Sequence, residues 1–593
     1  MKSKIAVAVA VAVSLPSFAG ELSLASNRVE AVWSGRLTYE SDTSLVLKSS
    51  SAEYSSGFRL LPPPGKTSFD LSAGRYIAVD MEGLANHQQR ICLQIKDAGG
   101  EAYVGAALNE GEKVTVKLPL PHDFIYSSPS GAKGVRTMDT HHITNIAFMV
   151  VWPYEGQFNG LIHCRISNIR LSGTPDYKRH VAESAYLPFV DQYGQFRHSS
   201  WKGKVMTDDD LRAELTREDA QLQSAPSSWD QYGGWANGPQ LTATGHFRTQ
   251  KVNGKWWLVT PSGHLFYSLG INVIKTDSDA PNGTLHPDWY ESAAKSAMSF
   301  PTWNLQKKFN KTNFKSDYYQ FVLRRLNSWG INTIGNWSDG ALTNLGQKPY
   351  VMTIVSKPSG LPYLSGGFYD TLDSTFAQKM KNAVAAAVAV SGSSASIAVN
   401  DPMCIGFFID NELTFPSDSA YYEPYFKACK EAIAAVAPNK LYLGCRFKGL
   451  RNGDALWNAA AAWCDVVSAN SYVSSVAVHA QGSYAAPNID RPIMHTEFHY
   501  GTLQRGMFSG GLCPVSDQCE RGRSYRRVVE GALRHPLFVG SHWFQYRDQP
   551  IVGRGDGEDC QIGFIDVCDR AYPQLTSAVR SIAETMYNTR FSN

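Results

Sequence analysis

Two glutamates end or follow apolar runs that are typical of buried strands. The run that begins at Cys404 is followed by Asp410, Asn411 and Glu412, and a second run ends at Glu497. Hydrolysis of a glycosidic bond needs two carboxyl groups that flank one bond, about 5 to 5.5 Å apart in retaining enzymes. One must be protonated to release the leaving oxygen while the other attacks the sugar carbon, so their environments must separate their pKa values. Either glutamate alone is more simply a solvated loop residue, but the pair predicts glycosidase chemistry.

Polar and aromatic side chains at the ends of other predicted strands are expected to bind the sugar. Asn411 precedes Glu412 and is placed to hold a sugar 2-hydroxyl, a bond that strengthens in the transition state. Tyr472 is placed to hydrogen-bond Glu497 and to help keep it ionised. Trp543 is a candidate platform for a sugar ring, and packing in the core is an equal alternative. The predicted substrate-binding residues are Asn336, Trp337, Asn411, Arg446, Asn470, Tyr472, His495, His499, His542, Trp543 and Gln545.

Several of these polar residues have a second interpretation. Arg446 fits a contact with a carboxylate or sugar hydroxyl, or a structural ion pair. His495, Glu497 and His499 alternate along one strand and share a face, which is also a way to bind a transition metal. Histidines beside sugar hydroxyls are the simpler account. The acidic loop 556–559 fits calcium, but such loops are more often solvated. We therefore predict no metal and no cofactor.

The elements that must position these residues alternate between short strands and longer helices after Gly245. Helices are expected at 318–329, 376–390 and 422–436. This alternation predicts a (β/α)8 TIM barrel, an α/β fold whose active site lies at the C-terminal ends of the strands. The eight expected strands are 265–272, 331–337, 350–355, 404–409, 441–445, 466–470, 493–497 and 538–543.

The region before the barrel has a different pattern. Short apolar runs at 77–81, 91–95, 114–118, 146–152 and 166–171 are separated by turn residues, which predicts an N-terminal all-β sandwich of the jelly-roll, carbohydrate-binding-module-like type. We expect this domain at 20–175, a linker region with one helix (208–222) at 176–245, and the catalytic barrel at 246–593.

The first 19 residues have the three parts of a secretory signal peptide. Lys2 and Lys4 precede an apolar run at 5–15, and Ser17-Phe18-Ala19 is a small-residue cleavage site. The protein is therefore expected to be secreted or periplasmic. No later run reaches the roughly 20 apolar residues that span a membrane, so no membrane span is predicted.

Charge and cysteine content exclude some protein classes. The 56 Lys and Arg against 53 Asp and Glu leave a net charge of +3, too small for a nucleic-acid binder and better suited to a neutral partner. The oligomeric state is left open. Ten cysteines are too few for a disulfide framework. Isolated bridges remain open for three pairs, which are Cys513 with Cys519, Cys560 with Cys568, and Cys92 with Cys164.

Longer segments around the two glutamates resemble one glycosidase family. An Asn-Glu at the end of strand four and a Glu at the end of strand seven resemble a clan of barrel glycosidases that uses these positions for catalysis. The segments GFFIDNE (406–412), HTEFHYG (495–501), HWFQY (542–546) and IGFID (562–566) resemble the β-agarases of glycoside hydrolase family 50. The similarity extends from about residue 187 to the C-terminus.

The resemblance implies that Glu412 is the general acid/base and Glu497 the nucleophile of a retaining double displacement. It further implies hydrolysis of β-1,4 linkages in agarose to neoagaro-oligosaccharides such as neoagarobiose, with a galactan polysaccharide as the partner. Endo and exo action are both left open. Porphyran, another β-galactan or a β-galactoside is an alternative substrate. A non-catalytic polysaccharide-binding protein and a metal-dependent lyase or oxygenase are alternatives of other classes, and the presence of both glutamates argues against the first of these.

Overall fold

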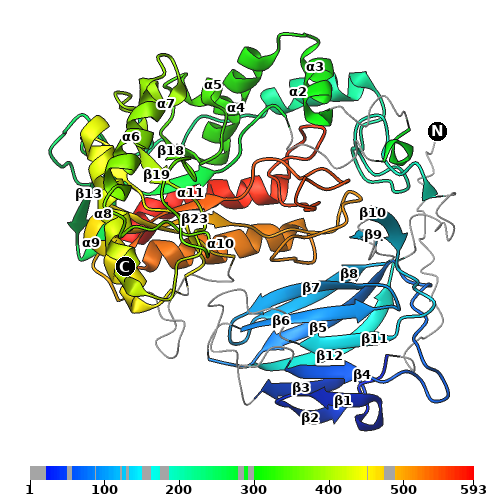
Figure 1. Cartoon of the computed structure of the whole chain (residues 1–593). Helices are drawn as coiled ribbons and strands as arrows, with labels where there is room; N and C mark the ends of the chain where they lie inside the picture. Colours follow the sequence, from blue (N-terminus) through cyan, green and yellow to red (C-terminus); the bar gives the residue numbers. More distant parts are fainter. Residues whose placement is uncertain are drawn as a thin grey trace.

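The chain folds into two groups of strands with helices around the second group (Figure 1). The computed structural model describes residues 22–49, 56–86, 89–120, 123–127, 133–149, 162–173, 186–277, 286–291, 299–450, 452–472 and 488–592. The predicted signal peptide lies outside these residues.

The N-terminal strands form two five-stranded antiparallel sheets. One has the order β1 (Val29–Val32), β4 (Gly57–Leu60), β11 (Asn145–Met149), β6 (Gln89–Lys96) and β7 (Glu101–Leu108). The other has the order β2 (Gly35–Ser41), β3 (Ser44–Ser49), β12 (His163–Ser172), β5 (Tyr76–Gly83) and β8 (Lys113–Pro119). A separate hairpin joins β9 (Asp123–Ser127) to β10 (Lys133–Thr137).

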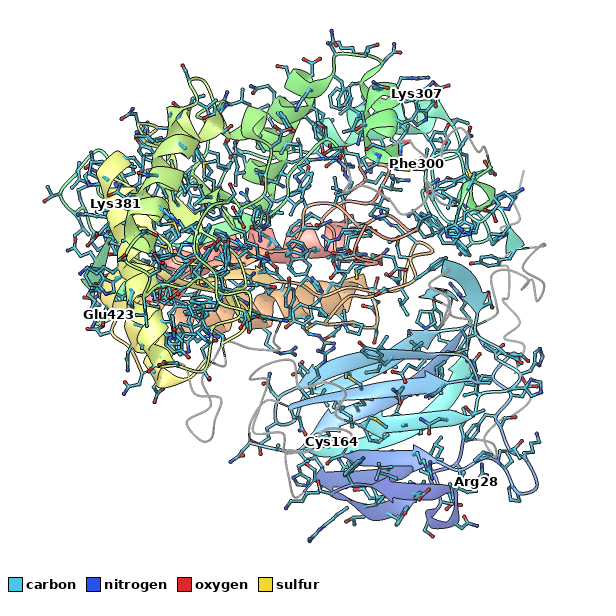
Figure 2. All side chains as sticks on the ribbon, viewed as in Figure 1. Arg28, Cys164, Phe300, Lys307, Lys381 and Glu423 are labelled. Carbon is cyan, nitrogen blue, oxygen red and sulfur yellow. The ribbon has the colours of Figure 1, made fainter. Side chains whose placement is uncertain are left out.

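Alternating side chains explain why these two sheets pack on each other. In β8, Val114, Val116 and Leu118 are buried while the residues between them are exposed, so the strand offers one apolar face. Phe58 of one sheet and Cys164 of the other belong to the same core, and Cys164 is labelled among the strands in Figure 2. The predicted all-β character of this region is confirmed.

A nine-stranded, wholly parallel sheet forms the centre of the C-terminal part. Several of its strands, such as the apolar Cys404–Ile409, are buried along their whole lengths. This is the pattern of parallel strands that are covered on both faces. The first strand, β16, pairs with the last, β24. The strands are β16 (Ser268–Ile271), β17 (Thr333–Ile334), β18 (Tyr350–Val355), β19 (Cys404–Ile409), β20 (Leu441–Tyr442), β21 (Phe447–Lys448), β22 (Val467–Asn470), β23 (Ile493–Phe498) and β24 (Phe538–Trp543).

The predicted strand at 441–445 is interrupted. Its first part, β20, pairs with β19, whereas β21 pairs with β22. Gly444 and Arg446 between them have positive φ angles of 80° and 54°, a left-handed conformation that cannot continue an extended strand. The turn directs Arg446 into the interior, where it is fully buried.

Helices alternate with these strands and cover them, as the sequence pattern predicts. Figure 1 shows α10 and α11 side by side in orange and red. The segment α8 has the predicted bounds, and Gly330 ends α4 in a left-handed conformation, as is common at helix C-termini. The helices are α2 (Asp208–Asp219), α3 (Phe300–Phe309), α4 (Lys315–Trp329), α5 (Gly340–Thr343), α6 (Phe376–Ala389), α7 (Ser394–Ala398), α8 (Tyr422–Val436), α9 (Asp454–Trp463), α10 (Gln518–Arg534) and α11 (Pro573–Ser592).

Residues 186–245, part of the expected linker, are packed against the C-terminal part. Glu218 at the end of α2 forms a bidentate ion pair with the buried Arg325 of α4, at 2.6 and 2.8 Å. Phe189 lies in an aromatic cluster with Trp289 and Phe508. The mixed polarity of this segment predicts a linker, because its few apolar residues do not form a periodic run. They instead fill gaps between elements distant in the chain. Three short strands, β13 (Arg248–Val252), β14 (Lys255–Val259) and β15 (Leu265–Phe266), follow this segment.

The N-terminal part of the chain contacts the loop after β23 and the helix α10. The backbone N–H of Gly105 donates to the carbonyl of Pro514 at 3.0 Å, and Arg527 of α10 pairs with Glu112 at 2.8 Å.

All ten cysteines are free thiols, so the three bridges considered from the sequence are not formed. Cys92 and Cys164 lie in different sheets. Within the described part of the chain, no helix is both long and apolar enough to cross a membrane.

Candidate active site

A cavity of about 520 Å³ opens at the C-terminal ends of the parallel strands and contains both glutamates. Glu412 reaches it from the segment after β19, and Glu497 from the end of β23. Parallel strands bring their C-terminal ends to one edge of the sheet, so residues far apart in sequence meet there. The cavity is lined by Val273, Lys275, Trp337, Asn411, Glu412, Lys448, Asn470, Tyr472, Glu497, Leu512, Phe544, Arg554, Asp556 and Glu558.

Two donors hold the Glu497 carboxylate. Arg446 Nη2 donates to Oε1, and the Tyr472 hydroxyl donates to Oε2 at 2.7 Å. Glu497 is only 6% exposed, so the guanidinium charge of Arg446 acts on it with little screening by water. Burial and the neighbouring Glu497 raise the pKa of Tyr472 well above its ordinary value, and the phenol therefore remains a donor at neutral pH.

Glu412 has a different environment. Asn470 Nδ2 donates to its Oε1 at 2.9 Å. Burial raises the pKa of Glu412 above its ordinary value of 4.5, and the nearby Glu497 adds to this increase, while the Asn470 N–H and the Arg446 charge oppose it. A carboxyl group with a raised pKa is suited to carry a proton near neutral pH.

The segment between β19 and Glu412 is fixed by a buried carboxylate that sequence reasoning did not place in the site. Asp410 is completely buried, with a positive φ of 64°. It accepts hydrogen bonds from the hydroxyls of Tyr369 and Tyr425, each at 2.9 Å, and from the backbone N–H of Lys357 at 2.6 Å. These bonds end the strand abruptly and turn Asn411 and Glu412 toward the cavity.

Six of the predicted residues line the cavity, and a seventh, Arg446, lies behind them. Glu412, Glu497, Asn411, Asn470, Tyr472 and Trp337 line it, and Arg446 lies beneath Trp337, with its guanidinium carbon 5.7 Å from the ring centre. The sequence left open whether Arg446 contacts a catalytic carboxylate or forms a structural ion pair. Both apply, because its ion-pair partner is Glu497.

Three other predicted binding residues have structural contacts instead. Asn336 bridges β17 to β18 by two bonds to Thr353, at 2.8 and 2.9 Å. Trp543 is completely buried, donates its indole N–H to the Ile562 carbonyl at 2.7 Å and packs among aromatic rings. It is thus a core residue and does not serve as an exposed platform. Gln545 is 5% exposed and donates to the carbonyl of Arg547. None of the three lines the cavity.

The three predicted histidines are buried behind the cavity. Nε2 of His495 contacts the Ser471 carbonyl at 2.6 Å, and Nε2 of His542 contacts the Ser268 hydroxyl at 2.8 Å. His499 Nε2 accepts from the Leu512 N–H at 2.9 Å. Burial lowers the pKa to about 4 for His495 and to about 3 for His499 and His542, so all three are neutral at pH 7. The Nε2 atom of each histidine bonds to the protein itself, so the predicted contacts with sugar hydroxyls are not formed by these atoms. Among the described residues, no three metal-binding side chains gather at one point.

The cavity also has charged residues that strand-end reasoning missed. Lys275 and Lys448 line it, and the acidic loop considered for calcium contributes Asp556 and Glu558. Both acids pair with Arg554, at 2.5 and 3.0 Å, so the loop is an ion-pair cluster at the cavity wall. Lys448 ends β21, and the sequence does not indicate a strand end there because the fifth strand is interrupted. The loop 556–559 has no periodic pattern from which its position at the cavity could be predicted.

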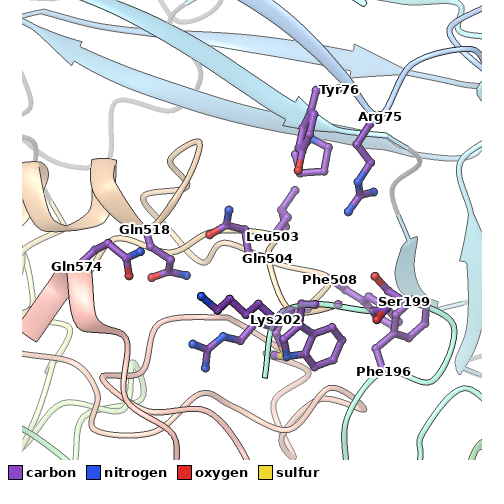
Figure 3. A pocket seen from close by; sticks show the side chains of 16 residues that line it. Arg75, Tyr76, Phe196, Ser199, Lys202, Leu503, Gln504, Phe508, Gln518 and Gln574 are labelled. Atoms are coloured by element: carbon purple, nitrogen blue, oxygen red, sulfur yellow. The ribbon is translucent and has the colours of Figure 1, made fainter. Parts of the chain in front are cut away.

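A second cavity, of about 310 Å³, lies between the N-terminal sheets and the loop after β23. Figure 3 shows Arg75 and Tyr76 on its upper side and Lys202 on its lower side, with Leu503 and Gln504 between them. Neither catalytic candidate borders it, so the chemistry belongs to the first cavity.

Comparison with known proteins finds similarity to β-agarases. No family model matches the chain. Beta-agarase B of Vibrio sp. (strain JT0107) is 25% identical, and the match covers 87% of this chain and 68% of that protein. Beta-agarase A of the same organism is 24% identical, and the match covers 94% of this chain and 70% of that protein.

Solved structures share the fold over nearly the whole chain. An exo-beta-agarase superposes with a TM-score of 0.70 at 22% identity, covering 96% of this chain and 98% of that chain. The agarase AgWH50C superposes with a TM-score of 0.70 at 23% identity, covering 98% and 100%. A mixed α/β fold with a sheet-rich N-terminal region is therefore established. The chain is similar to known β-agarases, and the resemblance to glycoside hydrolase family 50 that the motifs predicted is confirmed.

Proposed function

We propose that the chain is a retaining glycoside hydrolase that cleaves β-1,4 linkages of agarose and releases neoagaro-oligosaccharides. The observation that carries this proposal is the contrast between two carboxyl groups in one cavity. Glu497 is held by the Arg446 guanidinium and the Tyr472 hydroxyl, whereas burial raises the pKa of Glu412. A carboxyl group with a raised pKa, beside a second carboxyl group held by two donors, supplies the acid and the nucleophile that the reaction needs. Similarity to curated β-agarases supports agarose as the substrate.

In the first step, Glu412 donates its proton to the leaving glycosidic oxygen while Glu497 attacks the anomeric carbon and forms a glycosyl ester. The bond between that carbon and the leaving oxygen breaks, and its electron pair stays on the oxygen. In the second step, Glu412 removes a proton from water, which attacks the same carbon and releases Glu497. Arg446 and Tyr472 orient the attacking carboxylate throughout, and no cofactor enters the chemistry.

We also propose that the parallel sheet and its helices are a (β/α)8 barrel in which β20 and β21 are two parts of the fifth strand. Pairing of β16 with β24 supports closure, and the gap between β20 and β21 spans only the turn through Arg446.

The domain limits at 20–175 and 246–593 and export through residues 1–19 remain predictions. Sequencing the N-terminus of protein exported by a Gram-negative host tests the last of these.

A second substrate is favoured by one observation. Lys275 and Lys448 line the cavity, and neither has a carboxylate within ion-pair distance among the residues that the structure describes. Two such ammonium groups fit the sulfate ester of a galactan such as porphyran. Incubation with agarose, porphyran, carrageenan and a chromogenic β-galactoside, with products separated by size, distinguishes the two. Even-numbered neoagaro-oligosaccharides from agarose support the first proposal, and cleavage of porphyran alone replaces agarose as the substrate. If wild-type protein cleaves none of the four, the hydrolase assignment is wrong.

A further inference from the structure

The side chains between the two carboxyl groups form a hydrogen-bond chain whose direction is set by one donor. Arg446 Nε lies 2.8 Å from the side-chain oxygen of Asn411. A guanidinium has N–H donors and no acceptor, so the Asn411 amide must turn its oxygen toward Arg446. This orientation follows from the chemistry of the pair, although amide oxygen and nitrogen have the same shape.

The orientation of Asn411 determines that of Asn470. The same Asn411 oxygen is 3.2 Å from the Asn470 side chain, which must therefore present its NH2 group. That nitrogen is also 2.9 Å from Glu412 Oε1. The other end of the Asn470 amide accepts from the Thr496 hydroxyl at 2.8 Å. Asn470 and Thr496 are 2% and 0% exposed, so little water competes for these bonds.

We propose that Asn470 is a positioning residue for Glu412 and that Thr496 locks it in place. The inference rests on the proposed hydrolase function, and it identifies which oxygen of Glu412 carries the acid proton. Since an Asn470 N–H occupies Glu412 Oε1, the acid proton is carried by Oε2. Across the described residues, Oε2 has no hydrogen-bond partner, and Glu412 borders the cavity where the substrate binds.

This arrangement serves both steps of the reaction. In the first, the O–H bond at Oε2 breaks as the proton passes to the leaving oxygen, and the negative charge left on Glu412 is stabilised by the N–H that already contacts Oε1. In the second, Oε2 takes a proton from the attacking water. Asn470 donates to Oε1 in both states, so it fixes the direction of proton transfer without moving. The earlier assignment of Asn470 to sugar binding gives a different expectation, because loss of a sugar contact weakens substrate binding.

The test is the pH dependence of kcat/KM with a galactan oligosaccharide. Asn470→Asp keeps the shape but replaces the donor with a carboxyl group. The charged form of Glu412 is then disfavoured, its pKa rises, and the basic limb of the profile moves up by about one pH unit or more. We expect kcat to fall at least about 10-fold, with KM within about 2-fold of wild type. Thr496→Val, which leaves Asn470 unchanged, should shift the limb in the same direction by less.

Thr496→Ser is the matched control, since it keeps the hydroxyl and should restore the wild-type profile. Melting temperatures of all variants separate misfolding from a positioning effect, and the Thr496 pair remains informative if Asn470→Asp does not fold. A raised KM with an unshifted basic limb in Asn470→Asp overturns the inference, as does equal impairment of Thr496→Val and Thr496→Ser. These results leave the hydrolase proposal intact if wild type still cleaves galactan and Glu412→Ala does not. Absence of wild-type cleavage overturns both.

Discussion

Arg446 and Glu497 form an ion pair in which both side chains are shielded from water, 0% and 7% exposed. The pair joins the turn after β20 to the end of β23, and the same guanidinium reaches Asn411 beside Glu412. Removal of one partner from such a pair leaves a buried charge without compensation. The arginine thus stabilises the fold and orients the attacking carboxylate.

Arg446→Met should therefore lose both stability and activity. We expect unfolding in urea to show a loss of about 3–5 kcal/mol, because Glu497 remains buried without its cation. Activity should fall by at least about 100-fold. The control Arg526→Met breaks an exposed pair with Glu530 and should change stability by less than about 1 kcal/mol. Equal effects of the two substitutions would contradict the distinction between the buried and exposed pairs.

Tyr472→Phe should slow catalysis and lower the stability of the fold by no more than about 1.5–3 kcal/mol. It removes one hydrogen bond to the Glu497 carboxylate, and a bond to a charged group contributes about 1.5–3 kcal/mol, so kcat should fall about 10- to 100-fold. Tyr525→Phe is a matched control, because the Tyr525 hydroxyl is buried and has no hydrogen-bond partner in the part of the chain that is described. Steady-state kinetics that give the two variants the same kcat would refute the role of Tyr472.

The pKa of Glu412 predicts the basic limb of the pH profile. Because burial raises this pKa above 4.5, Glu412 keeps its proton and its acid function at pH values above 4.5, and activity is lost when the pH passes the raised pKa. Glu412→Gln removes the titrating group, so its residual kcat/KM should show no such limb. An unchanged basic limb in this variant would assign the titration to another residue.

Two tryptophans should respond in opposite ways. Trp543 is completely buried, so Trp543→Ala should destabilise the protein by about 3–5 kcal/mol. Trp337 lines the cavity, and Trp337→Ala should raise KM about 5- to 10-fold through loss of ring stacking while the melting temperature changes little. Calorimetry and kinetics on both variants decide this. A larger KM effect at Trp543 than at Trp337 would restore the platform that the sequence suggested.

Buried histidines predict a loss of stability in acid. His495, His499 and His542 have pKa values lowered to about 4, 3 and 3, whereas in the unfolded chain each titrates near 6.5. As pH falls below 6.5, the unfolded state binds protons that the folded state does not, so stability decreases down to about pH 4. The slope is up to about 1.4 kcal/mol per pH unit for each histidine. Urea unfolding across pH 4–7 measures it, with the exposed His141→Asn as a control. Burial raises the pKa of Asp548 to about 6 and of Asp559 to about 7, which offsets part of this slope. An unchanged slope in His542→Gln would therefore show that His542 is not buried as a neutral group.

Much of the parallel sheet was predictable, because its strands are continuous apolar runs with helices between them. The expected bounds of β18, β19 and β24 agree with the structure. The fifth strand was predicted as continuous since residues 441–445 are mostly apolar. Its break depends on left-handed backbone at Gly444 and Arg446, and only the glycine suggests this in the sequence.

The site was predictable where a residue ends or closely follows a strand and faces the cavity, as for Glu497 and Glu412. It was not predictable where the side chain turns to a neighbouring strand, as Asn336 does toward Thr353. Side chains alternate in direction along a strand, so proximity to a strand end does not determine which face a residue occupies. Loop residues such as Arg554 reach the cavity through tertiary contacts that no local pattern records.

The assignment of Glu497 as the nucleophile is tested most directly by mass spectrometry of a trapped intermediate. A 2-deoxy-2-fluoro galactoside with a good leaving group slows the second step, so the glycosyl ester accumulates and the labelled peptide can be sequenced. We predict a single fluorosugar on the peptide that contains Glu497, and none in Glu497→Gln. Label on another residue, or product release with inverted configuration and no trapped ester, would contradict the double displacement proposed for this chain.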